Sequence, residues 1–526
     1  TTPLPRGGWP DAARGRSRSA GTTVRVGVAA ATGFLPLAPV PHSMADDTAV
    51  VWFRRDLRLH DNEALADACD AEETLPVYVF DPREYGERPF GGDDSFRFEK
   101  TSPYRARFCR ESVADLRARL RERGSDLVVR SGRPEEVVPA VAAAVDADAV
   151  HFQTLPTPEE MVVENGVRAQ LRGIGPTPVR HWTHTLYHLN DLPTPYTDIS
   201  DTYTSFRKSV ENRATVRDPL TEPELPAAPV GAVGAGSIPT PADLGVDEID
   251  DERGVLPFEG GESAGIERLD RYLWTEDRLC EYKETRNGLL GQGFSSKLSP
   301  WLNAGSLSPR YVHAEVDRYE RERVSNDSTY WLVFELLWRD FFQFQFAKHG
   351  ADFFARGGIR DRDDIDWRED ETAFQRWAAG ETGVPFVDAA MRELNATGYQ
   401  SNRARQNAAS FLANDLRIDW RRGAAYFETQ LVDYDPASNY GNWAYIAGVG
   451  NDSRDRYFDV VKQAKRYDGD GAYVKHWIPE LADVPAGTVH EPWALNDTEQ
   501  ANYGVQLGVD YPEPMIDVEE RYRKLR

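Results

Sequence analysis

The spacing of apolar residues changes once along this chain, and that change constrains the fold more than any other feature. Short apolar runs at residues 49–53, 75–80, 127–130 and 149–152 alternate with amphipathic helical stretches. Such alternation predicts a doubly wound parallel sheet with helices on both faces. A nucleotide-type ligand is expected at the carboxyl ends of its strands. From residue 263 nearly to the end the period is helical, which predicts a second, all-α domain.

A segment rich in proline and glycine separates the two patterns. Residues 220–262 hold six Pro and seven Gly, a composition typical of a linker that lies over the surface. We therefore predict four parts: an α/β domain at 44–215, a linker at 216–262, a helical domain at 263–485 and a short C-terminal tail at 486–526.

The first 43 residues differ from the rest in composition. They are rich in Pro, Gly, Arg and Ala, and the chain turns acidic from Met44. We predict a disordered extension at 1–43, with Met44 as the natural start. An amphipathic targeting arm is the alternative, but six prolines interrupt any helix there.

Acidic residues strongly outnumber basic ones. The 526-residue chain has a net charge of −24 and a pI near 4.9, which counts against nucleic-acid binding because phosphates are repelled. However, residues 398–475 hold 11 Lys and Arg against 10 Asp and Glu, so this segment is nearly neutral. An acidic surface with one less acidic face also fits a protein from a halophile, because salt screens phosphate attraction.

The cysteines and the hydropathy exclude several classes of protein. Cys69, Cys109 and Cys280 are scattered, so neither a disulfide framework nor a metal site is indicated. No run of about 18 apolar residues is present, which argues against a transmembrane span. We expect a cytoplasmic, globular protein.

The stretch from Asp433 to Tyr445 combines carboxylates, amides and aromatic rings. Asp433, Asp435, Asn439 and Trp443 lie close together between proline and glycine residues. A tightly turning backbone with large flat side chains suits contact with a base or a cofactor ring. An aromatic-rich loop packed in a core explains the same pattern, and this stretch alone does not decide between the two.

Two more stretches contain candidate ligand-binding residues. The turn at 295–300 places three hydroxyls and an ammonium before a helix, which suits a diphosphate, although an ordinary Ser N-cap explains it too. The helix at 328–346 carries Glu335, Trp338 and Arg339 within little more than one turn. A buried glutamate beside a tryptophan requires a hydrogen-bonding partner, such as an amide or imide of a ligand.

Arginine-rich stretches have two interpretations each. The helix that begins at Asn402 suits phosphates and base edges, or it is a solvated face. The loop at 448–457 presents two arginines suited to a phosphate backbone. The turn at 54–62 makes salt bridges or contacts a cofactor.

Several long motifs resemble the photolyase/cryptochrome family. They are WFRRDLRLHDN at 52–62, ELLWRD at 335–340, TGYQSNR at 397–403 and IDWR at 418–421. Within that family, RQN at 405–407, NYGNW at 439–443 and GVGND at 448–452 resemble the DASH cryptochromes. The motifs occur in the right order across both domains, and the resemblance covers residues 49–481.

The resemblance implies that the helical domain binds FAD. It carries cofactor binding over to Tyr282, Ser295, Ser296, Lys297, Leu298, Ser299, Glu335, Arg339, Arg405, Asp433, Asp435 and Asn439. Of these, Arg405 and Asp433 would form an ion pair beside the flavin ring, and Asn439 would face flavin N5.

The resemblance also implies light-driven electron transfer to a cyclobutane pyrimidine dimer. Trp443, Trp420 and Trp367 would carry electrons from the surface to the flavin, and Glu335 and Asn439 complete the catalytic set. Tryptophans usually anchor a core, and the sequence alone does not show whether these three line up. DNA and the lesion would be contacted by Arg286, Glu335, Trp338, Asn402, Arg403, Tyr445, Arg454 and Arg456.

Two departures from the family pattern matter. Tyr445 stands where many photolyases have a second tryptophan, which suggests a shallower lesion pocket and a preference for unpaired strands. In DASH relatives a glutamate in the segment after His151 binds a folate antenna. Here Leu155 takes its place, so an antenna chromophore, methenyltetrahydrofolate or another, is in doubt.

The leading hypothesis is an FAD-dependent lyase that repairs pyrimidine dimers in single-stranded or looped DNA. The alternative is a blue-light photoreceptor with little repair activity, which would use the same FAD and tryptophans. We expect a monomer, with no metal and no membrane partner.

Overall fold

The computed structural model describes residues 47–90, 95–247, 249, 251, 253–451, 457–518, 520 and 521. The extension predicted at 1–43 lies outside the described residues, as do Arg454 and Arg456. No helix in the described ranges is both long and apolar enough to cross a bilayer.

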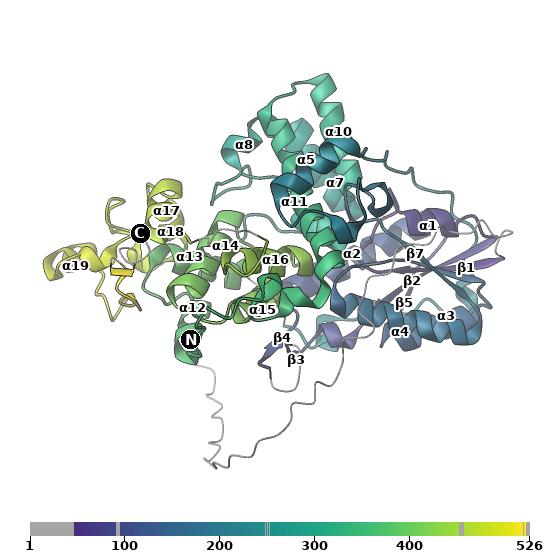
Figure 1. The fold of residues 1–526 in the computed structure, drawn as a ribbon, viewed down its shortest axis with the longest axis horizontal. Helices are drawn as coiled ribbons and strands as arrows, with labels where there is room; N and C mark the ends of the chain where they lie inside the picture. Colours follow the sequence, from purple (N-terminus) through teal and green to yellow (C-terminus); the bar gives the residue numbers. More distant parts are fainter. Residues whose placement is uncertain are drawn as a thin grey trace, which may run out of the picture.

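A five-stranded parallel sheet forms the N-terminal domain (Figure 1). Its strands are β1 (Thr48–Phe53), β2 (Glu73–Phe80), β5 (Val128–Ser131), β6 (Ala149–Gln153) and β7 (Thr177–His181), in the order β5-β2-β1-β6-β7. Trp52 of β1 is in register with Val77 of β2 and Phe152 of β6. The predicted doubly wound sheet is therefore confirmed. A small antiparallel hairpin, β3 (Glu87–Pro89) with β4 (Arg97–Glu99), lies apart from it.

Both faces of the sheet are covered because alternate strand residues point to opposite sides. Val50 and Trp52 belong to the core on one face, whereas Val51 and Phe53 belong to the core on the other. Helices α3 (Pro134–Ala144) and α4 (Pro158–Ile174) cover the first face, and α1 (Glu63–Ala68) and α2 (Pro103–Glu122) cover the second. A strand buried on both faces reads as a continuous apolar run, as residues 49–53 do.

The segment predicted as a linker lies along the sheet. After α5 (Tyr203–Arg213), the Thr74 amide donates to the Ala227 carbonyl, and the Val129 amide of β5 donates to the Ala235 carbonyl at 2.9 Å. The second bond occupies a backbone group of the edge strand β5 that would otherwise be open to pairing, and the first occupies one of β2 beyond the reach of β5. A short helix, α6 (Pro241–Leu244), follows.

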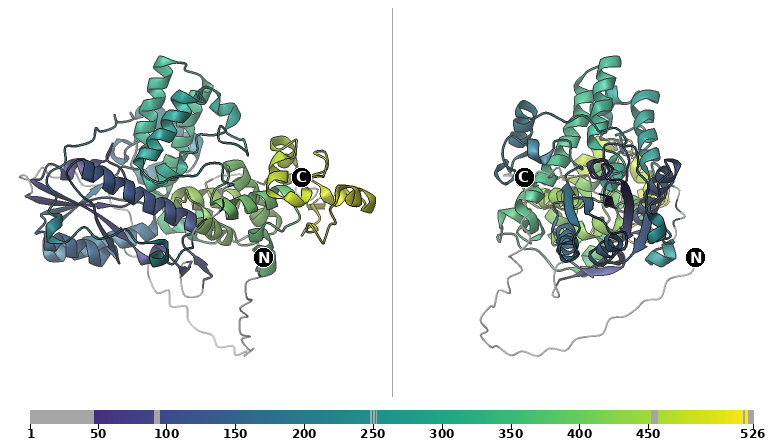
Figure 2. Two further views of the ribbon diagram at one scale, coloured as in Figure 1. Left: turned by 180° about the vertical axis from the view of Figure 1, so that it is seen from behind. Right: turned by 90° about the vertical axis from the view of Figure 1, so that its right-hand side faces the viewer.

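The rest of the described chain is helical, as predicted. Its helices are α7 (Glu262–Asp270), α8 (Tyr282–Thr285), α9 (Ser299–Ala304), α10 (Pro309–Glu322), α11 (Asp327–His349), α12 (Glu371–Ala379), α13 (Pro385–Thr397), α14 (Asn402–Ser410), α15 (Trp420–Gln430), α16 (Pro436–Ile446), α17 (Val460–Tyr467), α18 (Ala472–Trp477) and α19 (Asp497–Tyr503). The sheet and α19 lie at opposite ends of the molecule in two opposed views (Figures 1 and 2).

The arginine-rich turn after β1 joins the two domains. Arg58 is 1% exposed and donates to the carbonyls of Gly305 and Thr183. Asp61 forms a buried ion pair with Arg310 at 2.5 Å. These contacts hold the two domains together, and the Asp61–Arg310 pair is costly to disturb because each charge would lose its partner. Arg55 of the same turn instead lines the cavity described below.

Candidate functional site

The acidic loop that precedes α16 is held from two sides. Asp435 caps α16, accepting a hydrogen bond from the Ser438 amide at 2.8 Å. The Gln343 amide of α11 donates to both oxygens of Asp435, at 2.9 and 3.1 Å. Gly441 of α16 allows this close packing, because a Cβ there would lie 2.3 Å from Phe342 of α11.

Asp433 lies among polar side chains that donate hydrogen bonds to only one of its two carboxylate oxygens. Arg405 of α14 donates to its Oδ2 at 2.8 Å, and the Ser299 hydroxyl donates to the same oxygen at 2.6 Å. Its Oδ1 is buried and has no hydrogen-bond partner within the described part of the chain. A buried unpaired carboxylate oxygen is costly, so a bound group that donates a hydrogen bond fits here. The predicted pairing of Arg405 with Asp433 is present.

The turn that enters α9 has a strained backbone. Ser295 and Lys297 adopt left-handed conformations, with φ of 53° and 56°. Such values in residues other than glycine cluster at ligand-binding sites. Lys297 is buried, and its ammonium donates to the carbonyls of Phe294 and Gln292. Burial lowers the pKa of Lys297 to about 6, and the nearby Arg268 acts in the same direction.

The remaining residues predicted for the cofactor lie in three places. Tyr282, Ser296 and Leu298 are buried near this turn, with Leu298 as the residue before α9. Arg339 instead donates to the carbonyls of His184 and Leu302, so it fixes the domain contact. Asn439 donates to the Ala424 carbonyl at 2.9 Å, which holds its amide in one orientation.

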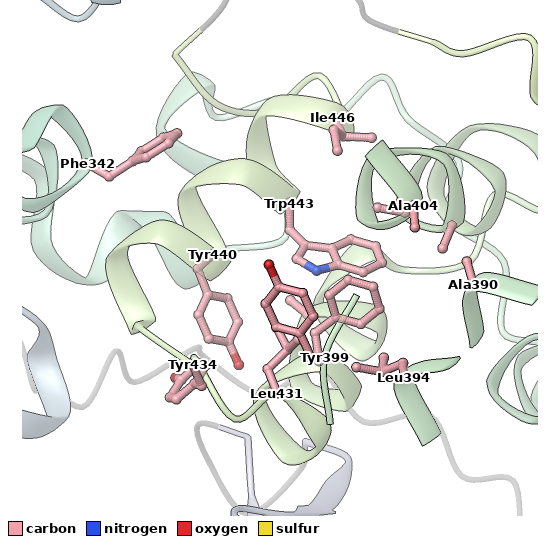
Figure 3. Packing of buried hydrophobic residues seen from close by; sticks show 14 of the residues in the cluster. Phe342, Ala390, Leu394, Tyr399, Ala404, Leu431, Tyr434, Tyr440, Trp443 and Ile446 are labelled. Atoms are coloured by element: carbon pink, nitrogen blue, oxygen red, sulfur yellow. The ribbon is translucent and has the colours of Figure 1, made fainter. Parts of the chain in front are cut away.

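The three predicted tryptophans are buried around α15. Trp443 of α16 packs against Gly423 of α15, where a Cβ would lie 2.3 Å from the indole. Trp420 begins the same helix and donates to the Arg356 carbonyl at 3.1 Å, and Arg356 donates to the Trp367 carbonyl at 3.1 Å. The structure therefore brings all three into one region. Figure 3 shows Trp443 among the buried residues of this cluster.

Glu335 and Arg286 form an ion pair beside this site. Their side chains are 30% and 24% exposed. Burial raises the pKa of Glu335, while Arg286 opposes that shift.

Trp338 forms one wall of an aromatic corner with Tyr445. Their ring centroids lie 6.0 Å apart at 80°. On its other side Trp338 stacks on Tyr203 of α5, with centroids 3.6 Å apart and planes at 8°. Tyr203 was not predicted as a site residue, because nothing in its local sequence indicates that it lies under Trp338.

Two predicted DNA-contacting residues lie at the start of α14. Asn402 is exposed. Arg403 donates to Gln406 and to Asn287, both at 3.0 Å, and lies over the Tyr467 ring. These contacts leave the arginine near the surface but in a fixed position.

A separate cavity of about 580 Å³ opens at the carboxyl ends of β1 and β2. This is the edge of the sheet where the strand pattern predicts a ligand. Leu155 belongs to its lining, together with Trp52, Arg55, Tyr78, Arg83, Glu84, Tyr85, Lys100, Arg105, Phe108, Glu159, Glu160, Glu428 and Tyr434. Aromatic rings and charges of both signs therefore face this cavity.

Comparison with known proteins matches both domains. A family model described as DNA photolyase matches residues 49–227, and one described as the FAD binding domain of DNA photolyase matches residues 331–526. The unpartnered Asp433 oxygen and the Arg405 pair lie within the second match, and the residues present fit FAD.

Relatives match over nearly the whole chain. Cryptochrome DASH of Natronomonas pharaonis is 61% identical over 91% of this chain and 100% of its own length, and that of Gloeobacter violaceus is 53% identical over 90% and 94%. The crystal structure of a Synechocystis cryptochrome superposes with a TM-score of 0.86 at 46% identity, covering 92% of this chain and 100% of that one. An archaeal photolyase from Sulfolobus tokodaii superposes with a TM-score of 0.70 at 28% identity, covering 91% and 100%. With its α/β domain, its helical FAD-binding domain and these relatives, the chain belongs to the photolyase family as a cryptochrome DASH.

Proposed function

We propose that this protein is a light-dependent lyase that splits cyclobutane pyrimidine dimers in single-stranded DNA. The observation that carries the proposal is the placement of the Glu335–Arg286 pair next to the Trp338–Tyr445 corner. The rings of Trp338 and Tyr445 would pack on the apolar faces of a pyrimidine dimer, and the Glu335 carboxyl group would reach the polar edge of the dimer.

Glu335 has the properties required to hold a pyrimidine ring. A pyrimidine presents both carbonyl oxygens and an imide N–H. The Glu335 carboxylate can accept a hydrogen bond from the imide, and the neighbouring Arg286 guanidinium can donate one to a ring carbonyl. Arg286 holds the carboxyl group in place and partly neutralises it.

The helical core has the residues to bind FAD beside this corner. Arg405, Asp433 and Ser299 would hold the flavin ring, with Asp433 Oδ1 accepting from it. The turn at Ser295 and Lys297 would receive the diphosphate. When bound, FAD would supply the electron that light transfers to the dimer. Trp443, Trp420 and Trp367 would return the flavin to its reduced form by relaying electrons from the surface.

The preference for single strands rests on Tyr445 and on charge. A phenol in place of an indole makes the corner smaller, so it holds an extruded dimer less tightly and favours a dimer that needs no extrusion. The net charge of −24 weakens general attraction to a duplex at low salt.

Repair is tested by illuminating the reduced protein with dimer-containing oligothymidine and following the return of thymine absorbance. We expect repair by the wild type and a marked loss in Glu335→Gln with normal flavin content. Glu322→Gln, at the exposed end of α10, is the matched control. No repair of single strands by the flavin-loaded wild type contradicts the proposal and leaves the photoreceptor function, in which illumination changes the flavin but not the DNA.

We also propose that the cavity at the carboxyl ends of β1 and β2 binds an antenna chromophore. Its aromatic lining and its position at the strand ends suit a flat ring system. The Sulfolobus photolyase structure is described as holding two FAD molecules, with the implication of a novel light-harvesting cofactor. Leu155 replaces the glutamate of the family pattern, but Glu159 and Glu160 also line the cavity, so it suits either a flavin-type or a folate-type ring. Analysis of the chromophores released when the protein is denatured would identify the antenna. A single FAD per chain with no second chromophore would contradict the antenna proposal.

A further inference from the structure

Tyr440 of α16 is a buried phenol with a carboxylate in hydrogen-bonding distance. It is 1% exposed, and its hydroxyl donates to Glu428 Oε2 at 2.7 Å. Glu428, on α15, is itself 2% exposed. Neither residue is among those assigned to FAD or to the lesion, although Glu428 also lines the cavity at the carboxyl ends of β1 and β2.

Two cationic side chains lie next to Glu428 in this buried position. Lys100 forms an ion pair with Glu428 Oε1, and it also pairs with Glu159 at 2.9 Å. Arg105 donates to the Glu428 carbonyl, so a second cation lies nearby. If Glu428 took up a proton, Lys100 would still be paired with Glu159. Neutralising Glu428 would therefore not leave the Lys100 ammonium without an ionic partner.

The ring of Tyr440 contacts the middle tryptophan of the chain. Its centroid lies 6.4 Å from that of Trp420, with planes at 72°. Tyr440 also contacts Phe354 and Phe90, whose phenyl rings are too hard to oxidise to give an electron to a tryptophan radical. Figure 3 shows Tyr440 and Trp443 leaving the same helix.

We propose that Tyr440 and Glu428 form a proton-coupled electron donor to oxidised Trp420. This inference rests on the proposed electron chain, in which the illuminated oxidised flavin is the one-electron oxidant that leaves a radical cation on Trp420. One electron passes from the Tyr440 phenol to the Trp420 radical cation, which becomes neutral indole. The phenolic O–H bond breaks and its proton forms an O–H bond on Glu428, leaving a neutral tyrosyl radical and a carboxylic acid.

The carboxylate decides whether this step occurs. A phenol that loses an electron while keeping its proton is a strong acid, so an indole radical oxidises it readily only where a base accepts the proton. Tyr440 meets this requirement at hydrogen-bond distance. Tyr426 does not, because its hydroxyl donates to the Asn395 amide oxygen and the Ala378 carbonyl.

Trp420 is therefore a branch point. One branch leads through Trp367 toward the surface, and the other stores the oxidising equivalent at Tyr440 inside the protein. A hole stored as a neutral radical with its proton on Glu428 returns to Trp420 only when the proton moves back, so charge recombination is delayed.

The test is time-resolved absorption and electron paramagnetic resonance of the illuminated FAD-loaded protein. We expect the tryptophan radical signal to be followed by a neutral tyrosyl signal that forms more slowly in D₂O. Tyr440→Phe should abolish the tyrosyl signal and lengthen the life of the tryptophan radical. Glu428→Gln should slow tyrosyl formation by about 100-fold, the range that a positioned proton acceptor provides. Tyr426→Phe is the matched control and should leave both signals unchanged.

Two results overturn the inference. Tryptophan radicals without any tyrosyl signal in the wild type show that Tyr440 is not oxidised, while the proposed chain and repair stand. A tyrosyl signal that persists in Tyr440→Phe assigns it to another residue. Absence of every protein radical overturns the electron chain itself and this inference with it, although repair by chemically reduced protein remains a separate measurement. The solvent isotope effect is measured on the wild type, so the inference is tested even if a variant loses flavin.

Discussion

Gly423 of α15 lies directly against the indole of Trp443 from α16. A Cβ at Gly423 would lie 2.3 Å from Trp443 Cη2 and 2.5 Å from Leu412 Cδ2. Trp443 and Trp420 thus share α15, one packing on its fourth residue and the other forming its first. The absence of a side chain at position 423 sets the place of the indole proposed to be nearest the flavin.

Gly423→Ala should displace Trp443 and destabilise the protein. Overpacking a core costs about 1–3 kcal/mol, of which alanine in a helix returns about 0.5–1 kcal/mol. Thermal unfolding should show a lower midpoint, and photoreduction should be slower in the flavin that remains bound. Gly487→Ala is the control, because a Cβ there meets nothing within 4 Å. Equal unfolding midpoints for the two variants would mean that overpacking at Trp443 costs no more than the helical gain from alanine.

The sheet could be predicted from the sequence because strands buried on both faces leave continuous apolar runs, as in residues 49–53. The Arg405–Asp433 pair was predicted from a motif, and the pair is present at 2.8 Å. Tyr203 and Gln343 could not be predicted in this way. Their roles arise from contacts between helices far apart in the sequence, Tyr203 with Trp338 and Gln343 with Asp435, and no local pattern records such a contact. The Tyr440–Glu428 hydrogen bond joins consecutive helices, and it was not predicted because the angle between two helices is not recorded in their local sequence.

Tyr203 should support Trp338 without touching the flavin-binding residues. Tyr203→Leu removes the stacked ring, and because an aromatic pair contributes about 0.5–1.5 kcal/mol, binding of a dimer-containing oligonucleotide should weaken by up to about tenfold. Flavin content should not change. Tyr203→Phe keeps the ring and loses only the hydrogen bond to the Phe334 carbonyl, so it should bind nearly as the wild type does. A larger loss in Tyr203→Phe than in Tyr203→Leu would contradict a stacking role.

FAD affinity should fall as pH rises above about 6. The pKa of Lys297 is lowered to about 6 by burial, so without the cofactor its amine is largely neutral at pH about 7. A bound diphosphate favours the ammonium, so binding takes up a proton and loses up to about tenfold in affinity per pH unit. Burial raises the pKa of Glu393 to about 8, so this neighbouring carboxyl keeps its proton through most of that window.

The measurement is a titration of flavin-free protein with FAD at several pH values. Lys297→Met should bind more weakly near pH 6 and show a flat profile. The same slope in Lys297→Met as in the wild type would assign the pH dependence to another group. Lys283→Met is the control, because Lys283 forms an exposed pair with Asp327.

The α/β domain should lose stability in acid through two stacked imidazoles. His151 Nδ1 lies 3.2 Å from His181 Nε2, and the rings stack with centroids 5.3 Å apart. Burial lowers the pKa of His151 from 6.5 to about 4 and that of His181 to about 3, with the charge of His151 adding to the second shift. The two imidazoles therefore bind protons near pH 6.5 in the unfolded chain but stay neutral at that pH in the folded chain. The stabilisation is complete above pH 6.5 and is lost as pH falls toward 4, by about 1.4 kcal/mol per pH unit for each ring.

Urea unfolding at pH values from about 7.5 to about 5 measures this slope. His151→Gln should lower the free energy of unfolding at neutral pH, because the stack is lost, but it should make the acid slope shallower. His476→Gln, at an exposed position of α18, should leave the slope unchanged. An unaltered slope in His151→Gln would mean that acid acts elsewhere. In that case Glu262 is the next group to vary, because His60 and Arg119 hold its pKa below the usual value against the effect of burial, so acid removes that stabilisation.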